Sequence, residues 1–185
     1  MNQKYQVSPA RTERRDQLKK AAQELIGTKI PQEFDLHHGP LCALDILMVV
    51  GSPWLKIGLE KDFSRDKSGY RKIGGRANSP KAPYFYRSTA NLIHYLKRQG
   101  FYLPRGSNEP AEEGMACFFD FDDRGRFNFT PDRSGIITKI EKGAIAELIL
   151  VQKAQDPDGG FEVSCVKLVP DSELDRALIG YCDLP

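Results

Sequence analysis

The stretch Gly135-Ile-Ile-Thr-Lys-Ile-Glu-Lys-Gly-Ala-Ile-Ala-Glu-Leu-Ile-Leu-Val151 contains two apolar, β-branched runs joined by a short polar turn that includes a glycine. Such runs on either side of a short turn predict an antiparallel β-hairpin. Two further apolar runs flank the hairpin, at residues 115–121 and 161–168, and turn residues separate them from it. The sequence therefore predicts an antiparallel sheet over residues 115–168.

Helical signals dominate the residues before this sheet. Residues 1–27 contain a capping serine followed by proline, then apolar residues at helical spacing, and end in glycine, which predicts an N-terminal helix. Residues 40–51 start with proline and are apolar nearly all round, which predicts a buried helix. Further helices are expected at residues 55–63, 88–100 and 171–178. Because helices precede an antiparallel sheet, the sequence predicts one α+β domain over residues 1–185.

The overall composition fits a globular domain. The chain has 185 residues, of which 40% are hydrophobic and 28% charged, an ordinary balance. No run of 18 apolar residues exists, so no membrane span is expected. The polar N-terminus lacks the apolar region of a signal peptide, but a chain already trimmed of its leader would look the same. The compartment, whether periplasmic, extracellular or cytoplasmic, and the oligomeric state therefore stay open.

The charge is unevenly spread along the chain. Residues 53–105 contain twelve Lys and Arg against three Asp and Glu, whereas residues 106–185 contain eight against sixteen. The stretch 64–83, rich in Gly, Lys, Arg and Ser, is expected to be an exposed basic connector. A segment of this kind can contact an anionic wall polymer or nucleic acid. A solvated helix face and loop is the simpler interpretation, because no nucleic-acid-binding motif accompanies the charge.

The cysteines do not predict a metal site. The four show no CxxC spacing and do not pair with histidines, so zinc is not expected. Cys117 and Cys165 lie in apolar runs and are expected to be buried thiols, while the state of Cys182 is left open. The acidic run 120–126 begins like a calcium loop but has Pro131 where that loop needs glutamate. We therefore predict neither a metal nor a cofactor.

Cys42 is the strongest candidate for chemistry. If Pro40 occupies the first helical position, Cys42 lies in the first turn, where free backbone N–H groups and the helix dipole stabilise a thiolate. A nucleophilic cysteine also needs a histidine on another element and a group that orients this histidine. The alternative is a small hydrophobic residue inside a buried helix, and the two interpretations are evenly balanced.

Three segments resemble, in order and spacing, the NlpC-type branch of the papain-like cysteine peptidase clan. They are Gly39-Pro-Leu-Cys-Ala-Leu-Asp45 at the start of a helix, Leu96-Lys-Arg-Gln-Gly-Phe-Tyr-Leu-Pro104, and Pro110-Ala-Glu-Glu-Gly-Met-Ala-Cys-Phe-Phe-Asp120, which leads into the first core strand. The resemblance covers residues 18–168 and is greatest to a bacterial branch with a longer segment after the nucleophile helix. It implies a papain-like fold, cell-wall peptides as the substrate class, and Cys42 as the nucleophile. It also makes Asp45 and Asp132 candidates for substrate binding.

The chain departs from this family at its catalytic histidine. The family's next core strand opens with that histidine just before a Gly-Ile pair, and here the register puts Arg133 at this position, with Ser134 beside it. Arginine stays protonated at any working pH and cannot act as a general base. The third, orienting position falls on the following strand, where Gln152 is the best candidate. This departure favours a catalytically silent domain over an active cysteine peptidase or amidase.

Other histidines offer a substitute base. His37 and His38 lie five and four residues before Cys42, close enough for a local Cys–His pair, although contacts within a polar turn are the simpler interpretation. His94 lies on the expected helix 88–100 and is interpreted as a partly buried helical residue.

Three hypotheses for the function follow. The first is an active cysteine hydrolase. The second is a silent papain-like domain that binds a cell-wall peptide or a protein partner. The third is a basic adaptor or immunity-type protein that uses residues 56–105.

Overall fold

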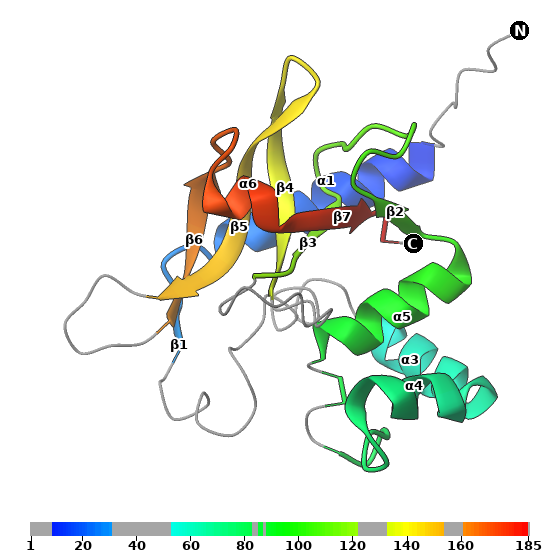
Figure 1. Ribbon diagram of the computed structural model, residues 1–185. Helices are drawn as coiled ribbons and strands as arrows, with labels where there is room; N and C mark the ends of the chain where they lie inside the picture. Colours follow the sequence, from blue (N-terminus) through cyan, green and yellow to red (C-terminus); the bar gives the residue numbers. More distant parts are fainter. Residues whose placement is uncertain are drawn as a thin grey trace, which may run out of the picture.

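The computed structural model describes residues 9–30, 53–82, 85–86, 88–121, 133–153 and 161–184 (Figure 1). Its elements are α1 (Pro9–Glu24), β1 (Lys29–Ile30), α3 (Pro53–Arg65), α4 (Lys67–Gly74), α5 (Thr89–Gln99), β2 (Tyr102–Pro104), β3 (Ala116–Phe119), β4 (Arg133–Glu141), β5 (Ala144–Lys153), β6 (Phe161–Lys167), α6 (Glu173–Ala177) and β7 (Leu178–Cys182). This mixture of helices and antiparallel strands confirms the α+β class. Within the described ranges, no helix is long and apolar enough to cross a membrane. The helix expected over residues 40–51 lies outside these ranges.

Seven strands form one antiparallel sheet, in the order β1-β6-β5-β4-β3-β7-β2. The meander from β3 to β6 confirms the predicted run of strands over residues 115–168. Its central hairpin joins β4 to β5 through Lys142 and Gly143, whose φ angles of 50° and 80° are both left-handed. A two-residue turn with two left-handed positions matches the right-handed twist of the flanking strands. The turn therefore sets the register of the hairpin, with Glu141 opposite Ala144.

The last strand, β7, lies outside the predicted sheet. The short helix expected at residues 171–178 is present as α6, and the Ser172 hydroxyl caps it by accepting a hydrogen bond of 3.1 Å from the Asp175 N–H. The chain then enters β7, which pairs with β3 on one side and with β2 on the other. A five-residue strand that is largely buried shows too little alternation to be distinguished from the end of a helix.

Part of the expected connector 64–83 is a helix. Asp66 caps α4 by accepting a hydrogen bond of 3.0 Å from the Gly69 N–H, and Tyr70 in the middle of α4 is fully buried. Gly69 and Gly74 lower the helix propensity of the segment, so the sequence did not predict this helix. The connector is therefore exposed along its basic residues, as expected, but anchored by an aromatic side chain.

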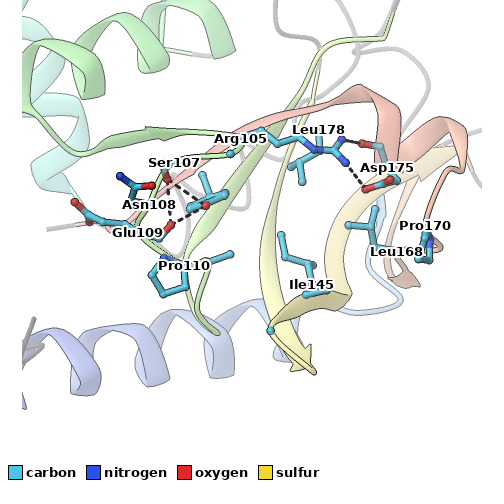
Figure 2. A pocket seen from close by; sticks show the side chains of 15 residues that line it. Arg105, Ser107, Asn108, Glu109, Pro110, Ile145, Leu168, Pro170, Asp175 and Leu178 are labelled. Carbon is cyan, nitrogen blue, oxygen red and sulfur yellow. Dashed lines mark hydrogen bonds and ion pairs between the residues drawn. The ribbon is translucent and has the colours of Figure 1, made fainter. Parts of the chain in front are cut away.

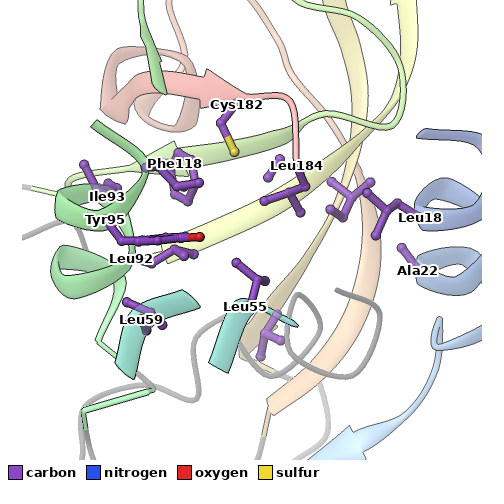
Figure 3. Close-up of a cluster of buried hydrophobic side chains, with 14 of the residues drawn as sticks. Leu18, Ala22, Leu55, Leu59, Leu92, Ile93, Tyr95, Phe118, Cys182 and Leu184 are labelled. Carbon is purple, nitrogen blue, oxygen red and sulfur yellow. The ribbon is translucent and has the colours of Figure 1, made fainter. Parts of the chain in front are cut away.

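The sheet separates two hydrophobic cores. On one face, which we call the helix-covered face, side chains of α1, α3 and α5 pack against the strands (Figure 3). This core includes Leu18, Leu55, Leu59, Leu92, Leu96, Phe118, Ile136, Ile149 and Cys182. On the opposite face, which we call the α6 face, a smaller core is covered by α6 and neighbouring loops. It includes Met115, Cys117, Phe119, Ile137, Leu148, Leu150, Leu168 and Leu178.

The ends of α5 were correctly predicted from local chemistry. The Ser88 hydroxyl accepts a hydrogen bond of 3.2 Å from the Asn91 N–H, and Gly100 ends the helix with a φ of 76°. A serine cap and a left-handed glycine satisfy backbone groups that the helix leaves free. Because α5 packs between α3 and the sheet, its fixed ends position the whole helical layer.

Candidate functional site

The structure describes three of the residues predicted to form a site, namely Arg133, Ser134 and Gln152. The others lie outside the described residues, and these are Cys42, His37, His38, Asp45 and Asp132. The described part of the candidate site therefore lies at the start of β4 and the end of β5.

Arg133 opens β4 and lies opposite Phe119 of β3. Its guanidinium carbon lies 4.7 Å from the centre of the Phe121 ring. Phe119 and Phe121 are themselves stacked, with ring centres 6.2 Å apart, and both contribute to the core on the α6 face. A cation over an aromatic face at this distance gains about 0.5–1 kcal/mol when partly exposed. The aromatic pair therefore holds the half-buried guanidinium on the α6 face.

Ser134 points to the opposite face. It lies opposite Phe118, which belongs to the core on the helix-covered face, and its side chain is fully buried. Its hydroxyl oxygen has no hydrogen-bond partner in the described part of the chain. Successive side chains of a strand alternate between faces, so two neighbouring residues cannot serve the same side of the sheet. Arg133 and Ser134 thus lie on opposite faces of the sheet.

Gln152 shares a face with Arg133. The strands β4 and β5 pair Gly135 with Leu150, and Arg133 and Gln152 lie two residues beyond this pair on their respective strands. Leu150 belongs to the core on the α6 face, so alternation puts both Arg133 and Gln152 there. The structure therefore brings Arg133 and Gln152 to the same end and the same face of adjacent strands.

His94 is held by a hydrogen bond to Asp66. Its Nε2 lies 2.9 Å from Asp66 Oδ2, and its ring meets the Tyr70 ring edge-on at 4.8 Å. The hydrogen bond with His94, followed by that from the Gly69 N–H, lowers the pKa of Asp66. Arg98 adds a cationic partner, 3.4 Å from the same carboxylate oxygen. His94 thus joins α5 to the start of α4, as expected of a partly buried helical histidine.

Sequence reasoning missed a buried carboxylate in the helical layer. The side chain of Asp62 is 3% exposed and accepts hydrogen bonds from the Tyr70 hydroxyl at 2.9 Å and from Arg98 Nε at 3.0 Å. Burial, reinforced by Asp62, raises the pKa of Tyr70. The signal was present in the sequence, because Asp62 falls on the same helical stripe as Leu55 and Leu59. An acidic residue among the apolar residues of a helix is buried with them, and a buried carboxylate needs a partner. Such a residue therefore predicts a buried partner.

Two of the described cysteines, Cys117 and Cys182, do not provide a nucleophile. Cys117 and Cys182 are fully buried on adjacent strands, and burial raises the pKa of the Cys117 thiol to about 12 and that of Cys182 well above its usual value. Both thiols therefore stay protonated at neutral pH, unlike an activated cysteine. The prediction of a buried thiol is confirmed for Cys117 but is wrong for Cys165, which is exposed. Cys165 lies on β6, two residues after the buried Val163.

A hollow of about 510 Å³ opens on the α6 face (Figure 2). Its polar part is formed by the hydroxyls of Ser107 and Tyr181, which lie 3.3 Å apart and both donate to the Glu109 carbonyl oxygen. Arg105 and Asp175 form an ion pair of 3.1 Å at its rim. The apolar lining includes Ile145, Leu168 and Leu178. A concave apolar surface with a few fixed polar groups can receive a small side chain.

A second hollow, of about 410 Å³, lies on the other side of residues 108–110. Arg15 lines it and is only 6% exposed. Its guanidinium makes two hydrogen bonds to the Asp183 carboxylate, of 2.8 and 2.7 Å, and a further one to Glu112. These carboxylates neutralise the charge of the Arg15 guanidinium. The ion pair between Arg15 and Asp183 therefore joins α1 to the C-terminal residues instead of presenting a free charge.

In comparisons with known proteins, no family model, no curated protein and no solved structure matches this chain. Among the described residues, no group of three or more His, Cys, Asp or Glu side chains is arranged to hold a metal ion.

Proposed function

We propose that this chain is a papain-like, NlpC-type domain that binds bacterial cell-wall peptides and lacks the usual catalytic base, with Cys42 at the nucleophile position. The observation that supports the proposal is the common placement of Arg133 and Gln152. They lie on one face at the same end of adjacent strands. The family resemblance assigns these two positions to the histidine and to the polar residue that orients it.

The chemistry of Arg133 favours binding over turnover. A guanidinium keeps its protons at working pH, so it cannot take the proton of a thiol or return one to a leaving amine. It can instead bind a carboxylate through two parallel hydrogen bonds. With its guanidinium held on the Phe121 ring, Arg133 suits an anionic group of a peptide.

The proposal is tested by restoring the missing base. In Arg133→His, an imidazole beside Gln152 can accept the Cys42 proton. An unperturbed cysteine is only a few per cent ionised at pH 7, so full ionisation raises the alkylation rate by about thirtyfold at most. We expect iodoacetamide to label Cys42 faster in Arg133→His than in the natural chain, by up to about thirtyfold, as measured by peptide mass spectrometry.

The matched control is Ser134→His, which moves the imidazole to the other face of the sheet. It should leave Cys42 labelling unchanged, and thermal unfolding should show that both variants are folded. Equal labelling of Arg133→His and the natural chain, or acceleration only in Ser134→His, would contradict the assignment of Arg133. Cys42→Ala identifies the labelled thiol.

Absence of turnover is tested on the natural chain with cell-wall peptide fragments. We expect no hydrolysis above that of Cys42→Ala, together with saturable binding that Arg133→Ala weakens. Hydrolysis that is lost in His37→Ala or His38→Ala would instead show an active Cys–His pair and would overturn the silent domain.

A further inference from the structure

The helices α3 and α4 and the loop after them present a surplus of exposed cations. Seven Lys and Arg side chains between residues 61 and 81 are exposed and make no hydrogen bond, ion pair or ring contact with the described part of the chain. We call them the basic surface, and they are Lys61, Arg65, Lys67, Arg71, Lys72, Arg76 and Lys81. Among the described residues from 61 to 81, no aromatic side chain is exposed.

The acidic residues of the same helices do not neutralise this surface, because each is engaged elsewhere. Glu60 accepts a hydrogen bond of 2.5 Å from the Tyr86 hydroxyl. Asp62 is buried against Tyr70 and Arg98, and Asp66 is bound by His94. All three carboxylates of the segment 53–105 therefore have partners outside the seven cations.

Two cations outside the basic surface have carboxylate partners. Lys139 lies 2.6 Å from Glu141 on β4, and Lys19 of α1 lies 2.5 Å from Glu113. Unpaired like charges that crowd one region repel each other and favour a bound polyanion. The basic surface is therefore a dense group of cations without carboxylate partners in the described residues, on a nearly neutral chain whose net charge is +2.

We infer that the basic surface binds a phosphodiester-linked polyanion through its backbone phosphates. The cations extend over two helices and a loop, so they suit a ligand with repeated charges better than a single small anion. Lys67 and Arg71 are one helical turn apart and lie on the same side of α4, where they can contact successive charges. Without an exposed aromatic platform in the described stretch, base stacking is not available, and recognition is independent of base sequence.

This inference does not depend on the proposed peptide site, because the basic surface lies on α3 and α4 whereas Arg133 lies on β4. The same phosphodiester chemistry occurs in nucleic acids and in polyol-phosphate wall polymers. Both are therefore used as probes, the first as a labelled single-stranded oligothymidylate and the second as a poly(glycerol phosphate) chain.

The experiment measures affinity by fluorescence anisotropy between 50 and 200 mM salt. If about five phosphates are contacted, the slope of log K against log salt is about −3.5, and the affinity falls about a hundredfold over this range. The variant Lys67→Glu, Arg71→Glu, Lys72→Glu should lose three contacts, which reduces the slope by about 2 and abolishes most binding at 100 mM salt.

The matched control reverses three exposed lysines elsewhere, in Lys20→Glu, Lys142→Glu, Lys167→Glu. Each triple variant lowers the net charge by six, from +2 to −4, so the two differ only in the position of the change. The control should bind with the slope of the natural chain, and both variants should unfold at temperatures close to that of the natural chain. A third variant, Lys67→Gln, Arg71→Gln, Lys72→Gln, replaces the first if charge reversal impairs folding.

The outcomes separate the possible ligands. Binding to one probe alone identifies the source of the phosphodiester chain. Equal weakening in both triple variants would show a general effect of net charge and would refute the inference. Binding to vesicles with anionic lipids but to neither probe would assign the surface to a membrane, with the exposed Ile57 and Ile73 as apolar contacts, and would also refute it.

Discussion

Replacing Asp62 by alanine removes the acceptor at the centre of the helical layer. The Tyr70 side chain is fully buried, and its hydroxyl donates to Asp62 Oδ2 at 2.9 Å. A buried hydroxyl that loses its acceptor costs about 1–3 kcal/mol. Arg98 also loses an acceptor, but its side chain is 38% exposed and can turn to water. We therefore expect Asp62→Ala to lower the free energy of unfolding by about 1–3 kcal/mol.

A double-mutant cycle separates this loss from a general effect of the substitution. Tyr70→Phe removes the donor but leaves Asp62 with Arg98 and Gln99, so it should cost only about 1 kcal/mol. In Asp62→Ala, Tyr70→Phe no hydroxyl is left without a partner. The double variant should therefore lose about 1–2 kcal/mol less than the sum of the single variants.

The free energies are measured by urea unfolding at pH 7, followed by circular dichroism. The matched control is Lys61→Ala on the exposed side of the same helix, which should change the stability by less than about 0.5 kcal/mol. Additivity of the two single variants within about 0.5 kcal/mol would refute the reasoning, because it would mean that Asp62 and Tyr70 contribute independently.

Three further predictions concern the Arg15 ion pair and the described cysteines. Arg15→Met leaves the Asp183 carboxylate, 14% exposed, without its bidentate partner and should lower the free energy of unfolding in urea by about 3 kcal/mol. The control Arg11→Met, whose contact with Asp183 is 3.8 Å long and exposed, should lower it by less than about 0.5 kcal/mol. Equal losses in the two variants would contradict this prediction. An aromatic disulfide reagent should label Cys165 at once and Cys117 only after unfolding. Because the pKa of Cys117 is about 12 when folded and 9.0 when unfolded, its stabilising effect is complete below pH 9 and is lost as the pH rises toward 12. Cys117→Ala should therefore lose less stability than the natural chain between pH 8 and pH 10, and an equal loss would contradict the role of burial.

Local signals predicted the parts of the fold that depend on local chemistry. The serine cap and the glycine at the ends of α5 act on backbone groups within a few residues, and the turn at Lys142 and Gly143 sets the hairpin by its own geometry. The helix α4 and the strand β7 depend on distant partners instead. Tyr70 fixes α4 only because α3 and α5 supply its surroundings, and β7 is a strand because β3 and β2 lie on either side of it.

The candidate site was predictable to a similar extent. The family resemblance selected Arg133 and Gln152, and strand alternation alone could have put Ser134 on the other face of the sheet. The contact between the Arg133 guanidinium and the Phe121 ring could not be predicted, because no spacing rule says where Phe121 lies after β3. The exposure of Cys165 was missed for the same kind of reason, because an apolar run does not show which of its side chains are buried.

The proposed peptide site and the basic surface depend on different residues. Each can therefore be altered and measured without changing the other. On the helices, the carboxylates have partners and the cations of the basic surface are left free, whereas the proposed peptide site depends on a single cation, Arg133 of β4. Arg133→His should change Cys42 labelling without changing the salt dependence of polyanion binding, and the α4 triple variant should do the reverse. If one substitution altered both readouts, the peptide site and the basic surface would belong to one binding region, and the separation of faces deduced from β4 would have to be abandoned.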